Sequence, residues 1–172
     1  MAEGKINANL RISDGTNDYK TLKELCKRGA CTAYMTGRGP FTVTSWVTYY
    51  IPLRTLSIND NTKFEGTATG GVKILKDMEV LISAQMCNWG CPDISDETDI
   101  NIKLNRNGTE TNCGKAYSWT GRTSACHDHH VTPFYMELKA GDILYLTFLS
   151  SVGGSWRVLG DDMCTYLTIQ EL

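Results

Sequence analysis

Long hydrophobic runs are missing from this 172-residue chain. The longest nearly continuous apolar stretch, ILYLTFL at residues 143–149, is far shorter than the roughly 20 residues that a membrane-spanning helix needs. The N-terminal segment MAEGKINANLRISDG has no apolar core of the kind that a secretory signal requires. We therefore expect no membrane insertion, and we expect the chain to be made in the cytoplasm or exported by a route that the sequence does not show.

An excess of charge of either sign is also missing. The chain has 17 Lys and Arg against 19 Asp and Glu, a formal net charge of −2. Its densest basic run, Lys27-Arg28, is too short to follow a phosphate backbone. The sequence therefore predicts no nucleic-acid partner.

Signatures of catalysis are missing as well. The segment GGSWRVLG around Ser155 lacks the G-x-S-x-G elbow of a nucleophilic serine. The glycines of GTATGG are placed at a hairpin and do not precede a helix, which argues against a phosphate-binding loop. We predict no catalytic residues and no enzymatic activity.

Cysteine, in contrast, is plentiful: the chain has seven, at positions 26, 31, 87, 91, 113, 126 and 164. In a secreted domain an odd count of this size indicates disulfides with one thiol left over. Without a secretory signal, reduced thiols are favoured. The sequence leaves the pairing open.

A period of two dominates the chain from Phe41 onward. Alternating segments are FTVTSWVTYYI, VLISAQM, DINIKL, FYMELKAGDILYLTFL and MCTYLTIQEL. Asn107-Gly108 is the dipeptide preferred in tight hairpins, and Gly141-Asp142 marks a second turn. About eight short strands with turns between them predict an all-β antiparallel sandwich of the jelly-roll type.

The first 40 residues follow a different pattern. YKTLKELCKRG, at residues 19–29, predicts one short helix with a capping pair of Thr21 and Glu24 and with Gly29 as its stop. This segment is too small for a core of its own. We therefore predict an N-terminal arm or attachment segment at 1–40 and a head domain at 41–172.

Three stretches carry a family resemblance. They are TATGGVKILKDMEVLISAQM, INIKLNRNG and MELKAGDILYLTF, and TYLTIQEL follows them as a terminal strand. In order and spacing they resemble the strands and hairpins of the tumour necrosis factor (TNF) and complement globular-head superfamily. The resemblance implies a TNF-like jelly roll that assembles as a homotrimer.

The residues themselves give a physical reason for several copies. In ILYLTFL, Ile143, Tyr145 and Leu149 alternate with Leu144, Leu146 and Phe148, so this strand is apolar on both faces. The outer face of a sandwich strand should be polar, and the second apolar face therefore needs a cover. Sister subunits are the favoured cover, and the N-terminal arm of the same chain is the alternative.

The opening NLRISDGTNDYKTLKEL, residues 9–25, is similar to the start of many bacteriophage virion proteins. With a trimeric head it suggests a virion component assembled in the host cytoplasm: a fibre or spike head, or a decoration protein. Its arm would contact other virion proteins, and its head a host-surface glycan or protein. A bacterial surface or spore-coat protein of the same fold is an alternative.

All three histidines of the chain lie in CHDHH, at residues 126–130. In an extended strand His127 and His129 point one way and His130 the other, so a single H-x-H pair cannot fill a metal shell. Three copies around a trimer axis would supply six imidazoles for a structural Fe or Zn ion. A polar loop without metal is favoured over this site, and a metal-dependent enzyme using Cys126, His127, His129 and His130 is the remaining alternative.

Three tryptophans lie in Gly-, Ser- and Asn-rich segments: Trp89, Trp119 and Trp156. Exposed aromatic rings beside polar groups suit the binding of a sugar or a protein. Rings that close the ends of the sandwich are an equally good interpretation.

Overall fold

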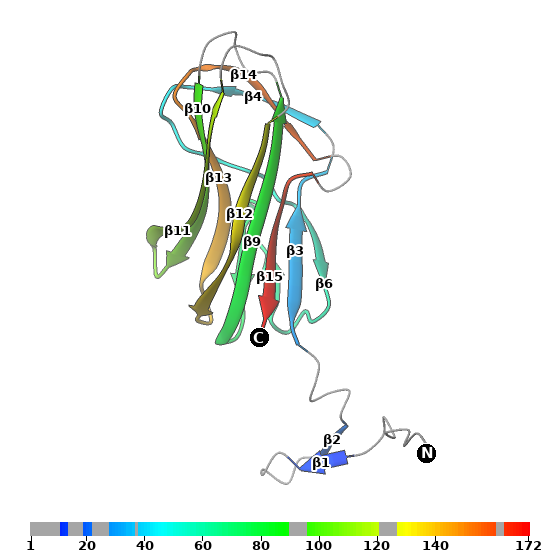
Figure 1. Cartoon of the computed structure of the whole chain (residues 1–172). Coiled ribbons are helices and arrows are strands. Elements are labelled where there is room, and N and C mark those ends of the chain that lie inside the picture. The colour runs from blue at the N-terminus through cyan, green and yellow to red at the C-terminus, as the bar shows by residue number, and fades with distance from the viewer. Residues whose placement is uncertain are drawn as a thin grey trace, which may run out of the picture.

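The computed structural model describes residues 11–13, 19–21, 28–36, 38–89, 96–120, 127–160 and 164–172. These residues form strands and connecting turns, and the two principal antiparallel sheets lie face to face (Figure 1). The predicted all-β sandwich is confirmed. Within the described parts of the chain, no helical segment has the length and apolar character needed to cross a membrane.

The larger sheet has seven strands. Its path runs through β4 (Arg38–Val43), β14 (Gly154–Leu159), β9 (Met78–Trp89), β15 (Tyr166–Glu171), β3 (Ala30–Tyr34) and β6 (Thr55–Ile58), with β12 (His127–Leu138) paired to β9. Figure 1 shows β12, β9, β15 and β3 side by side. Antiparallel pairing of β15 with β3 brings the C-terminus next to the start of β3.

The smaller sheet has six strands. Its path runs through β11 (Thr109–Thr120), β10 (Asp96–Arg106), β13 (Ile143–Ser150), β8 (Val72–Ile74) and β7 (Phe64–Gly66), with β5 (Tyr49–Tyr50) paired to β13. The hairpin of β10 and β11 turns at Asn107 and Gly108, whose φ angles of 54° and 84° fit the left-handed turn that this dipeptide favours. The predicted hairpin is therefore confirmed.

One core lies between the two sheets. The period of two places alternate residues inward, as predicted for VLISAQM: Val80, Ile82, Ala84 and Met86 are buried. The facing residues come from the smaller sheet: Ile100, Ile102, Leu144, Leu146 and Phe148.

The second apolar face of β13 is partly covered within the chain. Tyr145 is half-buried, and its ring meets the ring of Tyr50 on β5 edge-on at 5.3 Å. Gly71 lies so close to the Tyr145 ring that a Cβ atom on Gly71 would be 2.5 Å from Cε1 of Tyr145. The cover expected from sister subunits or the N-terminal arm thus comes in part from β5 and Gly71.

The N-terminal region differs from the sequence interpretation in two respects. Residues 19–21, the start of the expected helix, form the strand β2 (Tyr19–Thr21), which pairs with β1 (Arg11–Ser13). The remainder of that helix, at residues 22–27, lies outside the described residues. In addition, β3 is a strand of the larger sheet, so sheet pairing reaches back to Ala30, well before the expected boundary at Phe41.

Candidate functional site

The outer face of the larger sheet is the first candidate contact surface. It is formed by alternate residues that point away from the core on β3, β9, β12 and β15. Cross-strand pairs on this face are Leu81 with Tyr135, Ser83 with Thr168, and Tyr34 with Tyr166. Leu81 is 36% exposed and Tyr135 52% exposed. The face therefore combines aromatic, aliphatic, hydroxyl and amide groups.

Acidic groups mark one limit of this face. Glu79 and Glu137 are directly opposite each other on β9 and β12, an arrangement in which like charges repel. The hydroxyl of Tyr135 donates to Oε1 of Glu137 at 3.4 Å. Loss of hydration and the neighbouring carboxylates raise the pKa of Tyr135 above its usual range. Beyond this pair the surface is charged, so the uncharged face ends here.

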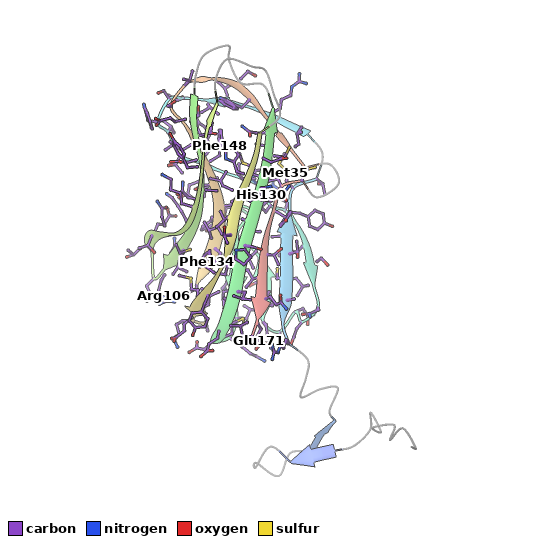
Figure 2. All side chains as sticks on the ribbon, in the orientation of Figure 1. Met35, Arg106, His130, Phe134, Phe148 and Glu171 are labelled. Atoms are coloured by element: carbon purple, nitrogen blue, oxygen red, sulfur yellow. The ribbon has the colours of Figure 1, made fainter. Side chains whose placement is uncertain are left out.

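The joint between the head and the preceding residues lies at the end of the sandwich where the C-terminus is found. The backbone N–H of Glu171 donates to the carbonyl of Gly29 at 2.8 Å, and its carboxylate accepts from Gly29 N at 2.5 Å and Lys63 Nζ at 2.6 Å. Burial would raise the pKa of Glu171, but the Lys63 ammonium and the Gly29 N–H hold it below its usual range. Figure 2 shows Glu171 at this end.

The histidine segment forms the start of β12. His129 is buried, whereas Asp128 and His130 are exposed, which confirms the predicted alternation. Nε2 of His129 lies 3.3 Å from Oγ1 of Thr98 on β10, in the opposite sheet. The ring is 2% exposed and so faces the interior of one chain, away from any surface shared between copies.

Metal binding at this segment stays a prediction. The side chain of His127 and the whole of Cys126 lie outside the described residues. Among the side chains that are described, no group of three or more His, Cys, Asp and Glu is arranged to hold a metal ion. The proposed Fe or Zn ion therefore depends on His127 together with a rearrangement that brings His129 to the surface.

Trp156 belongs to the core. Its side chain is 0% exposed and packs edge-on against Phe148, with ring centroids 5.4 Å apart. Its expected role as a binding ring is therefore wrong. Trp89 is the last residue of β9, and Trp119 is the next-to-last residue of β11. Their side chains lie outside the described residues, and their binding role stays a prediction.

Other aromatic rings, which sequence analysis did not select, are exposed. They are Trp46 at 61%, Tyr50 at 43% and Tyr117 at 55%. Lys115 and Tyr117 are two residues apart on β11 and therefore lie on the same face of the sheet. Extending the strand alternation past the Asn-Gly turn would have predicted this from the sequence. Trp46 had no such signal, because its turn contains neither glycine nor proline.

Comparison with known proteins shows the fold but not a family. No family model and no curated protein matches the sequence. Among solved structures, Eiger TNF from S. frugiperda is similar with a TM-score of 0.62 and 12% identity, over 84% of this chain and 91% of that chain. Murine APRIL at pH 5.0 is similar with a TM-score of 0.64 and 11% identity, over 85% of this chain and 100% of that chain. Murine APRIL at pH 8.5 is similar with a TM-score of 0.61 and 12% identity, over 85% of this chain and 100% of that chain. The chain thus has a TNF-like jelly-roll fold.

Proposed function

We propose that the chain is the non-enzymatic, homotrimeric head of a virion component, a fibre or spike head or a decoration protein that attaches to a host surface or a particle. The trimer is supported chiefly by the outer face of the larger sheet. Its exposed Leu81 and Tyr135 are neighbours across β9 and β12. Depletion of charge and enrichment of tyrosine are typical of the centre of a protein interface.

Attachment is assigned to the residues that precede β3. The strands β1 and β2 pair with each other and with neither large sheet, and the chain enters the head at the joint of Gly29 and Glu171. The similarity of residues 9–25 to the openings of bacteriophage virion proteins supports a place in a virion. Under this proposal the preceding segment contacts other virion proteins and the head projects.

Replacement of Leu81 by Asp tests the trimer. A charge at this position would be buried without a partner between copies, which costs several kcal/mol. We expect the unmodified chain to have three times the 19.1 kDa mass of one chain by light scattering, and Leu81→Asp to have the mass of a single chain. Thermal unfolding of the unmodified protein should also depend on its concentration.

Tyr117→Asp is the matched control, because Tyr117 is also exposed, at 55% against 36% for Leu81, but lies on the smaller sheet. It should remain trimeric. A monomeric unmodified protein, or a Leu81→Asp variant that keeps the trimeric mass, would contradict the proposed interface.

A further inference from the structure

The outer face of the smaller sheet carries a second group of exposed aromatic residues. Tyr50 on β5 and Tyr117 on β11 extend from it, 43% and 55% exposed. Strands β13 and β10 run between β5 and β11, so the backbones that carry the two tyrosines are three strand spacings apart, roughly 14 Å. Between them lie Asn101, which is paired with Thr147, and Asp99, which is opposite Tyr117 on one side and Leu149 on the other. We call this surface the tyrosine patch, formed by Tyr50, Asp99, Asn101, Lys103, Lys115 and Tyr117.

Two acceptor oxygens in the patch have no hydrogen-bond partner. They are Oδ1 of Asp99 and Oδ1 of Asn101, and both atoms are buried. Asn101 as a whole is only 8% exposed. A buried acceptor without a donor costs about 1–3 kcal/mol, so the patch gains stability when a ligand supplies hydroxyl donors. Lys115 lies beside both acceptors: it pairs with Asn101 across the strands, and its Nζ contacts the other carboxylate oxygen of Asp99. Its side chain is 55% exposed, so a ligand that displaces it reaches the two oxygens.

The charges of the patch cancel each other. Nζ of Lys115 lies 2.8 Å from the Asp99 carboxylate, and Nζ of Lys103 lies 3.4 Å from that of Glu110. The Tyr50 hydroxyl donates to the same Glu110 carboxylate at 2.5 Å. Both lysines are thus already paired with carboxylates, and an anionic ligand would have to compete with them. A neutral ligand fits this balance better.

Each ring has a lysine near it, and Lys103 holds the Tyr50 ring in place. Nζ of Lys103 lies 5.5 Å from the centroid of the Tyr50 ring, and Nζ of Lys115 lies 5.9 Å from that of Tyr117. Cation–π contacts at this distance favour one ring orientation. The Tyr50 ring, which Lys103 already orders, loses less entropy when a ligand packs on it.

From these observations we infer that the tyrosine patch binds a neutral oligosaccharide. The tyrosine rings contact the C–H faces of separate sugar units, and Asp99 and Asn101 accept hydrogen bonds from hydroxyls between them. A protein partner fits less well, because charged residues are depleted at the centre of a protein interface, whereas this patch carries Asp99, Lys103 and Lys115. The inference rests on the binding role proposed for the head and names its ligand class.

A printed array of neutral and acidic oligosaccharides of graded length tests the site. The unmodified full chain should bind neutral members, and longer ones better than single sugars, because one sugar cannot reach both rings. Tyr117→Ala should weaken binding about 3- to 10-fold through loss of one aromatic contact. Asn101→Ala should weaken it roughly tenfold through loss of a buried acceptor.

Trp46→Ala is the control, since it removes an exposed ring, at 61%, that lies outside the patch. It should bind as the unmodified protein does, and all variants should keep its melting temperature within a few degrees. Binding to no neutral oligosaccharide, binding to acidic members alone, or equal binding by Tyr117→Ala would overturn the inference. Light scattering on the same samples shows whether the trimer has formed. Failure to bind sugar is thus distinguished from failure of the trimer, because the trimer interface at Leu81 lies on the other sheet.

Discussion

At the scale of single residues, Asp142 shows how one buried charge is held. Its side chain is 1% exposed and accepts hydrogen bonds from Nε and Nη2 of Arg106 at 2.8 and 2.6 Å, and from the Lys139 N–H at 2.8 Å. Burial alone would raise the pKa of Asp142, but Arg106 and the Lys139 N–H outweigh it and hold this pKa below its usual range.

The lowered pKa predicts a dependence of stability on pH. Because the carboxylate binds a proton less readily in the folded chain, its contribution is complete above the unfolded pKa of about 3.9 and is lost as the pH falls through the folded pKa. We expect Asp142→Asn to lower the free energy of unfolding by about 2–3 kcal/mol at neutral pH. The variant should also lose less stability on acidification.

Urea unfolding measured from about pH 7 down to about pH 2 checks this expectation. Arg106→Lys is the matched variant: it keeps the charge but not the two-point contact, and should fall between the parent and Asp142→Asn. Equal acid sensitivity in the parent and in Asp142→Asn would show that this pair does not control acid stability.

Trp156 shows what single-residue reading of the sequence misses. Its neighbours Gly153, Gly154 and Ser155 are typical of a loop, yet β14 is a strand inserted between β4 and β9. Those partners are distant in sequence, so no local pattern indicates that the ring is buried. The alternation of His129 and His130, in contrast, needs only local strand geometry and was predicted correctly.

At the scale of elements, the β10–β11 hairpin depends on a left-handed turn. Gly108 has φ of 84°, and a Cβ atom placed there would meet nothing within 4 Å. Gly108→Ala should therefore cost about 1–2 kcal/mol from backbone conformation alone. Asn107→Gly, at the neighbouring left-handed position, should cost much less, and chemical denaturation distinguishes the two. If both substitutions had the same effect, the turn would not be the cause.

The turn after β4 shows where local patterns fail. Residues 41–51 alternate as one strand, but β4 ends at Val43 and β5 begins at Tyr49. Trp46, with φ of 60°, donates its N–H to the carbonyl of Ser150 at 2.8 Å. Ser45 donates to the carbonyl of Ser151, 106 residues away in sequence. Distant hydrogen bonds thus stabilise a strained conformation that the segment does not encode locally.

At the scale of the whole molecule, the alternating segments and the hairpins were enough to predict an antiparallel jelly-roll sandwich, and the family resemblance implied its TNF-like form. The sequence did not reveal which sheet offers a free face. The two-faced apolar strand β13 indicated the smaller sheet, but Tyr50 covers part of it within one chain. The larger sheet instead presents Leu81 and Tyr135. The sequence does not single them out, because each lies between two apolar residues, Val80 and Ile82 or Phe134 and Met136, whose side chains point to the core.

Hydroxyl-radical footprinting of two tyrosines tests the assembly most directly. In a single chain Tyr135 is 52% exposed and Tyr117 55% exposed, so an isolated chain would be labelled nearly equally at both. If three copies bury the outer face of the larger sheet, Tyr135 is protected in the native protein while Tyr117 is labelled, and Leu81→Asp restores labelling of Tyr135. Equal labelling of both tyrosines in the native protein would contradict the trimer.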